Sequence, residues 1–119
     1  MARFDIVCPQ SEEGGPGVAH GGWTAAVLDE TLGHVPILHD QLTVTGTLTV
    51  RFIKPVPLER PLEATAWIDR VEGKKWFISG RLVLASSGAE LATGTGVWIA
   101  RDRKAHFSGF QEWLAEQET

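Results

Sequence analysis

The feature that most constrains the fold is a helical segment with almost no polar face. Residues 21–32 read GGWTAAVLDETL, and the segment is apolar almost all round until Asp29. A helix of this kind is usually buried, because no side of it suits water. Gly33 follows at a natural C-cap position and Pro36 stands three residues later, so the pattern predicts that the helix ends there.

The segment at residues 42–52 alternates with a period of two, which indicates a strand. Leu42, Val44 and Leu48 fall on one face, and the threonines, including Thr45, fall on the other. Three prolines then interrupt the pattern at positions 55, 57 and 61, where a residue without a backbone donor suits a loop or a sheet edge.

Further strands are predicted on both sides of this one. Residues 3–7 form a candidate short strand near the start. Three longer candidates are joined by turns into an antiparallel meander, which the strand at residues 42–52 enters through the proline segment. They run from about residue 62 to 69, 76 to 84 and 91 to 100. Gly94 and Gly96 weaken the last of them unless something packs close to its backbone.

The C-terminal residues predict a second, short helix. Ser108 and Gln111 resemble a capping box, and Phe110, Trp113 and Leu114 give the helix one apolar face. We expect this helix to be a packing element. One buried helix against one long antiparallel sheet is the simplest architecture that these elements permit, so the sequence predicts a single α+β domain over residues 1–119.

The composition narrows the class of protein. Of 119 residues, 43% are apolar and 22% charged, the balance of a soluble globular domain. The single Cys8 cannot form an internal disulfide, so we expect a reducing, cytoplasmic location. No stretch approaches the ~20 continuous apolar residues of a membrane span, and the N-terminus lacks the pattern of a secretory signal.

The net charge and the spacing of Cys and His residues argue against a nucleic-acid-binding protein and against a metal site. A net charge of -4 with dispersed cations gives no general electrostatic reason to bind nucleic acid. No group of Cys and His residues has the spacing of a metal site. We therefore expect neither a nucleic-acid partner nor a metal or other cofactor.

A glycine-rich loop, GGPGVAHGG at residues 14–22, runs directly into the start of the predicted helix. Helix N-termini present free backbone N–H groups and a partial positive charge, which stabilise an oxyanion that develops nearby. Gly21 and Gly22 lack the side chains that would keep a substrate carbonyl away from those donors. The simpler alternative is that these glycines only allow a tight turn.

Asp29 lies eight residues after Gly21, which is roughly 12 Å of rise along a helix. The two groups cannot act on one bond within a straight helix, so a site that uses both must take one of them from a second subunit packed antiparallel. An ionised carboxylate is costly to bury unless it is hydrogen-bonded, and such groups often have functional roles. The alternative is that Asp29 or Glu30 simply reaches solvent at the helix end.

Three segments carry a resemblance to a known family. They read HGGWTAAVLDE, TLTVRFIKPVPLERPLEATAWIDR and LATGTGVWIAR, and the similarity extends over nearly the whole chain, from about residue 14 to 101. They resemble the acyl-CoA thioesterases of the hotdog superfamily, in the phenylacetate-pathway-like group with the His-Gly-Gly signature. The resemblance implies a hotdog fold, in which an antiparallel sheet wraps one long central helix. It also implies hydrolysis of an acyl-CoA thioester to the free acid and CoA.

The same resemblance implies roles for the residues at the matching positions. Gly21 would polarise the thioester carbonyl through its backbone N–H. Asp29, contributed from the opposite subunit, would act as general base or nucleophile, and Glu30 stays open as the working acid. His20 and Gly22 would support the site by ordering the loop. The implied assembly is a homo-oligomer, a dimer or tetramer, with active sites at the subunit interface.

Other residues are candidates for contacts with the rest of the substrate. Arg51 and Lys54 flank the proline turn and could hold CoA phosphates by charge-assisted hydrogen bonds, although each alone also fits a solvated charge. Trp23 could line an acyl pocket or simply fill the core. Gly14 departs from the family pattern, because many members of the group carry an Asn there, so that role would fall to another group or to water.

Two alternative functions stay open at this point. A hotdog enoyl-CoA hydratase or dehydratase normally pairs a catalytic histidine with an acid, and His20 keeps that option available. A non-catalytic acyl-CoA-binding regulatory module gains weight from the departure at Gly14. The His-Gly-Gly arrangement and the position of Asp29 favour the hydrolase.

Overall fold

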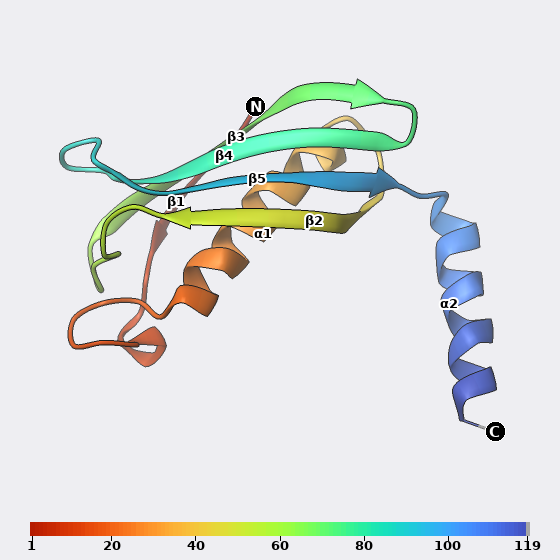
Figure 1. Ribbon diagram of the computed structural model, residues 1–119, viewed down its shortest axis with the longest axis horizontal. Coiled ribbons are helices and arrows are strands. Elements are labelled where there is room, and N and C mark those ends of the chain that lie inside the picture. Colours follow the sequence, from red (N-terminus) through yellow and green to blue (C-terminus); the bar gives the residue numbers. More distant parts are fainter. Residues whose placement is uncertain (119) are drawn as a thin grey trace.

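Five antiparallel strands form one sheet, and the long helix α1 lies across one face of it (Figure 1). The computed structural model describes residues 1–118. The elements confirm the predicted architecture of one long helix against one antiparallel sheet. In chain order they are β1 (Ala2–Val7), a 3-10 turn (Gln10–Glu12), α1 (Gly21–Leu38), β2 (Thr43–Phe52), β3 (Pro61–Glu72), β4 (Lys75–Leu84), β5 (Glu90–Ala100) and α2 (Arg103–Gln117).

The strand order is β1-β3-β4-β5-β2, and every neighbouring pair is antiparallel. The strands β3, β4 and β5 follow one another as the predicted meander. In contrast, β2 pairs with β5 and not with β3, so the proline segment at residues 53–60 carries the chain from one side of the sheet to the other. As a result, β1 and β2 are the two edges of the sheet.

The core lies between the sheet and one face of α1. The buried residues of this helix recur at spacings of three and four, which is the spacing of a single helix face. The hydroxyl of Thr31 is buried among them and donates a 2.7 Å hydrogen bond to the carbonyl oxygen of Val27, so it is not left unsatisfied. The buried face consists of Thr24, Val27, Leu28, Thr31, Leu32, Val35 and Pro36.

Glycines in the sheet let α1 approach closely. A Cβ at Gly80 would lie 2.5 Å from the side chain of Leu32, and a Cβ at Gly94 would lie 3.5 Å from the same side chain. At Gly96 the ring of Trp98 takes the corresponding space, 2.8 Å from where a Cβ would be. The expectation that something packs close to the glycines of the last strand is therefore confirmed.

The predicted end of α1 is wrong. The helix continues through Gly33 and Pro36 to Leu38, and its C-cap is His39. Gly33 serves packing, because a Cβ there would lie 3.0 Å from the indole nitrogen of the buried Trp98. Pro36 cannot donate a helical hydrogen bond, but it is fully buried in the core. Burial thus overrides both local signals for ending the helix.

The alternation of β2 is interrupted by a bulge. The register against β5 shifts between Thr45 and Thr47, which leaves Gly46 as the extra residue. Thr45 pairs with Trp98 and so lies on the face that α1 covers, as Leu48 does. The prediction that Thr45 and Leu48 lie on opposite faces is therefore wrong, because strict alternation does not hold across the bulge.

The second helix also differs from its prediction. It begins at Arg103 and not near Ser108, and the carboxylate of Asp102 caps it by accepting a 2.8 Å hydrogen bond from the N–H of Ala105. None of its residues is buried, and it projects away from the sheet (Figure 1). The expectation that α2 is a packing element finds no support among residues 1–118. Its exposed apolar side chains are Phe107, Phe110, Trp113 and Leu114.

The close contact between α1 and the sheet generates a stability prediction. Gly80→Ala should destabilise the fold by about 1–3 kcal/mol, because the added methyl group overpacks against Leu32. Gly109→Ala, at a position in α2 where an added Cβ meets nothing within 4 Å, should leave stability unchanged or slightly raised. Urea unfolding of the two variants measures the difference. Equal midpoints would show that the helix does not sit tightly on the sheet.

Candidate active site

His20 is the N-cap of α1, and both nitrogens of its ring are engaged. Nδ1 accepts a hydrogen bond from the N–H of Trp23 at 3.1 Å, and Nε2 donates to the carboxylate of Glu12 at 2.6 Å. A side-chain acceptor at this position satisfies one of the unpaired N–H groups at a helix start. The backbone N–H of His20 also donates to the carbonyl oxygen of Glu12 at 2.9 Å. The glycine-rich loop is thus joined to the first turn of α1.

The same loop is fastened to the segment that follows β2. The N–H of Ala19 donates to the carbonyl oxygen of Val56 at 2.9 Å. Within the loop, a Cβ at Gly14 would lie 2.8 Å from Cα and Cβ of His20. This close approach leaves no room for a side chain at Gly14 on the present backbone. The departure from the family pattern at this position therefore has a steric reason.

Gly21 opens α1 with a backbone N–H that has no hydrogen-bond acceptor among residues 1–118, and the same holds for Gly22. Both amides stand at the positive end of the helix dipole. Gly21 lines a cavity of about 300 Å³ between the loop and the segment after β2. The other residues that line it are Val18, Ala19, Thr24, Phe52, Ile53, Lys54, Pro55 and Val56. This cavity combines a free donor, mostly apolar walls and one cation.

Asp29 is half-buried on α1 and faces the edge strand β2. The hydroxyl of Thr45 donates a hydrogen bond to its Oδ1 at 2.8 Å. Because the bulge at Gly46 brings Thr45 to the helix side of the strand, this contact depends on the irregularity of β2. A carboxylate with one such donor keeps further acceptor capacity. Asp29 is therefore held in place and is still able to bind a water molecule.

A single chain does not bring Gly21 and Asp29 together. They are about 12 Å apart along one helix, and Asp29 does not line the Gly21 cavity. Gly21 lies beside Phe52 at one end of β2, whereas Asp29 is bonded to Thr45 near the other end. A site that uses both groups requires two chains.

Glu30 lies on a different side of α1. It lines a cavity of about 310 Å³ beside β1, together with Phe4 and His34. Because β1 and β2 are opposite edges of the sheet, the two neighbouring carboxylates face opposite edges. Only Asp29 lies beside β2.

The predicted substrate-binding residues do not gather in one place. Lys54 lines the Gly21 cavity. Arg51 pairs with Thr93 on the face of the sheet that α1 leaves uncovered, where it lines a hollow of about 510 Å³. Trp23 is half-buried and packs against the hydrophobic core instead of lining the Gly21 cavity. Of the three predicted substrate-binding residues, only Lys54 lines the same cavity as Gly21 within one chain.

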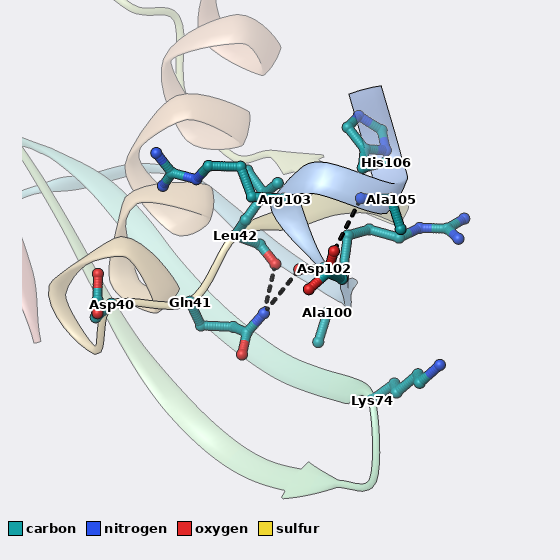
Figure 2. Close-up of a pocket in the computed structure, with 10 residues that line it drawn as sticks. Asp40, Gln41, Leu42, Lys74, Ala100, Asp102, Arg103, Ala105 and His106 are labelled. Atoms are coloured by element: carbon teal, nitrogen blue, oxygen red, sulfur yellow. Dashed lines mark hydrogen bonds between the residues drawn. The ribbon is translucent and has the colours of Figure 1, made fainter. Parts of the chain in front are cut away.

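A larger cavity, of about 720 Å³, lies between the end of β5 and the start of α2 (Figure 2). Lys74 and Arg103 line it, but Figure 2 shows their side chains pointing in different directions. The carboxylate of Asp102 is occupied by the cap of α2. Because these charged groups do not converge, the cavity is a poor candidate for the reaction site.

Two residues that hydrogen-bond to the candidate site residues, Glu12 and Thr45, are not among those predicted from the sequence. Glu12 meets His20 only because the irregular loop between them folds back on itself. No periodic pattern exists there that could have indicated the contact. Thr45 could have been found, because a glycine inside an alternating strand is a known signal for a bulge.

Other kinds of site find little support among residues 1–118. No group of three His, Cys, Asp or Glu residues is arranged to hold a metal ion, and neither helix is long and apolar enough to cross a membrane. Burial raises the pKa of the Cys8 thiol, and the nearby carboxylates of Glu12 and Glu59 raise it further. Such a thiol is not an activated nucleophile.

The arrangement of one long helix across a five-stranded antiparallel sheet is that of a hotdog-fold protein. A family model described as "Thioesterase superfamily" matches residues 16–89, more than half of the chain. The chain belongs to the thioesterase superfamily. This finding confirms the fold class and the superfamily that the sequence resemblance implied.

Individual relatives are consistent with this membership. Acyl-coenzyme A thioesterase THEM4 of Mus musculus is 33% identical over 90 residues, which make up 76% of this chain and 39% of that protein. The chain thus spans about two fifths of the length of this curated relative.

Two solved structures share the fold. One is a Bacillus halodurans protein with CoA, with 24% identity and a TM-score of 0.75 over 83% of this chain and 66% of that one. The other is the Escherichia coli PaaI protein from the phenylacetic acid degradation operon, with 16% identity and a TM-score of 0.79 over 84% and 72%. Membership of a phenylacetate-like group within the superfamily stays a prediction.

The capping role of His20 can be tested by stability. His20→Ala should destabilise the protein by about 1 kcal/mol, because α1 loses its N-cap acceptor. His20→Asn should recover most of this loss, since its amide oxygen can accept the same backbone N–H, although it gives up the contact with Glu12. Denaturant titration compares the two. If the Ala and Asn variants unfold at the same midpoint, the cap is not what His20 contributes.

Proposed function

We propose that this chain hydrolyses acyl-CoA thioesters to the free acid and CoA, at a site shared by two subunits. The observation that carries the proposal is the pairing of complementary half-sites on one helix: a free amide in a cavity at the start of α1, and a positioned carboxylate beside β2. Membership of the thioesterase superfamily supports the reaction type. The name of the mouse relative and the CoA in the Bacillus halodurans structure support the substrate class.

The edge strand β2 offers a way to join the half-sites. An unpaired edge presents free N–H and C=O groups to another strand. If a second copy pairs its β2 antiparallel to this one about a two-fold axis between Leu48 and Thr49, the partner's Phe52 comes opposite Thr45. Gly21 lies beside Phe52 and Asp29 is bonded to Thr45. Each carboxylate then faces the helix start of the other chain, and two-fold symmetry gives two equal sites.

In such a site Asp29 removes a proton from a water molecule, and the hydroxide attacks the thioester carbonyl carbon. The oxyanion that forms accepts a hydrogen bond from the Gly21 N–H of the other subunit. The C–S bond then breaks and CoA leaves as a thiolate. Asp29 gives the proton that it took from water to this thiolate. Direct attack by Asp29, followed by hydrolysis of the resulting anhydride, gives the same products.

The surrounding residues take supporting roles in this proposal. Thr45 orients the carboxylate of Asp29, and Lys54 supplies positive charge beside the Gly21 cavity for the phosphates of CoA. Arg51, on the uncovered face of the sheet, would reach the substrate only across a further subunit contact. The geometry of the single chain gives no support to Trp23 as an acyl-pocket residue, since it packs on the core.

The other functions have less support. A hydratase would need His20 to take up a proton, but both of its ring nitrogens are already hydrogen-bonded. No observation favours a purely binding module, because the carboxylate and the free amide are both in place. A tetramer rather than a dimer, and a cytoplasmic location, stay predictions.

The working acid can be identified by substitution. Asp29→Asn should lower kcat by about 100- to 10,000-fold, because a neutral amide cannot accept the proton or attack the carbonyl. Glu30→Gln, its matched control on the other side of α1, should keep most of the activity. Release of free thiol from short-chain, medium-chain and aryl-CoA substrates measures both. Absence of turnover by the native protein, or equal rates in native and Asp29→Asn protein, would refute hydrolysis at this site.

The shared site can be tested by complementation. Gly21→Pro removes the N–H at the first helical position, where proline is well accommodated, whereas Gly21→Ala keeps it. Gly21→Pro and Asp29→Asn should each be inactive alone. Mixed oligomers of the two contain one intact site per heterodimer, so random mixing should restore about a quarter of native activity. No recovery in verified mixed oligomers would place both groups in the same subunit's site.

A further inference from the structure

The exposed helix α2 carries an apolar seam that nothing else among residues 1–118 covers. Neither α1 nor any strand packs along it, and it extends away from the sheet (Figure 1). Phe107, Phe110 and Leu114 are spaced by three and four residues, the pattern of a two-helix seam. Trp113 flanks this seam. The exposed fraction is 56% for Phe107, 51% for Phe110, 37% for Leu114 and 55% for Trp113.

Apart from the N-cap carboxylate of Asp102, the charges at the two ends of α2 are opposed to its dipole. Arg103 and Lys104 stand in the first turn, and Glu118 is the C-cap, while the first turn has no acidic residue and the last turn no basic one. Cations at an N-terminus and carboxylates at a C-terminus are each unfavourable for an isolated helix. A second helix running in the opposite direction offsets these unfavourable interactions, because it brings opposite charges together at both ends of the pair.

We propose that α2 is a self-association helix that pairs antiparallel with α2 of a second copy of this chain. A two-fold axis near Phe110 covers the apolar seam and also brings opposite charges together. It sets Phe107 against the partner's Leu114, and it sets Arg103 and Lys104 near the partner's Glu118. The surface is therefore complementary to itself, as a closed two-fold interface must be.

The charge balance argues against a membrane as the occupant. Interfacial helices that bind anionic lipid are rich in cations on their polar face. Here Arg103 and Lys104 are outnumbered by Glu112, Glu116 and Glu118. A second copy fits the pattern better, because its acidic end meets the basic end of the first.

This interface is separate from the edge of β2 and does not depend on the proposed reaction. A helix of 15 residues is only about 22 Å long, so one pair alone is a small contact. Its effect is largest where it links subunits that another contact already holds, since the second contact then forms at a high effective concentration. The α2 pairs would thus join two β2-linked dimers into a larger assembly.

The test measures the mass of the full chain by light scattering. Phe110→Glu should lower the native assembly to about half its mass, because two carboxylates would then meet at the two-fold axis. Ser108→Glu adds the same charge on the opposite side of the helix and should leave the mass unchanged. Thioester hydrolysis per chain should be the same in both variants. An unchanged mass in Phe110→Glu, or binding of α2 to anionic vesicles without any change of mass, would overturn the proposal.

The direction of pairing has its own test. Phe110→Cys should form a disulfide between two chains on oxidation, whereas Phe107→Cys should not, because antiparallel pairing separates the two copies of that position. Reversal of Arg103 and Lys104 to Glu should weaken association, and adding Glu118→Lys should restore it. Crosslinking through Phe107→Cys would indicate parallel helices and contradict the proposal. Asp29→Asn should keep the native mass, so loss of activity and loss of assembly remain distinguishable.

Discussion

The rest of the structure depends on the close packing of α1 against the sheet. Gly80 and Gly94 leave space that the side chain of Leu32 enters, so the helix cannot rotate or slide without losing close contact. That position fixes the two candidate site residues of α1, with Gly21 at one end of β2 and Asp29 near the other end of that strand. A slide of one helical turn, about 5.4 Å, would separate Asp29 from Thr45. The site is thus positioned by apolar packing far more than by its polar contacts.

In the proposed reaction each chain contributes two incomplete half-sites, so the chemistry depends on assembly. The loop contacts of His20 and Glu12 prepare the helix start before any substrate arrives, as electrostatic stabilisation requires. The bulge in β2 prepares the carboxylate through Thr45. An unpaired edge strand is normally a liability for aggregation. Here the same edge is where the two prepared halves can meet, while α2 offers a second, independent contact surface.

The sequence predicted the elements well where the pattern repeats over many residues. Alternation predicts the strands and the meander, and the apolar composition predicts the long helix. The errors arose where one residue type has several physical uses. Gly33 fits the pattern of a helix end, yet it makes room for Trp98. Ser108 fits the pattern of a helix cap, yet Asp102 caps α2. Strict alternation puts Thr45 on the wrong face of the sheet, because the alternation is interrupted at the bulge.

By itself, the sequence determined which segments become helix and strand, that the long helix packs against the sheet, and that its glycine start and its acid are too far apart to share a bond in one chain. These properties depend on residues close together along the chain. Only the tertiary structure decided that β2 pairs with β5, that Asp29 and not Glu30 faces β2, and that Glu12 holds His20. Those outcomes depend on contacts between segments that are distant in sequence, where the packing of the whole core selects the partner.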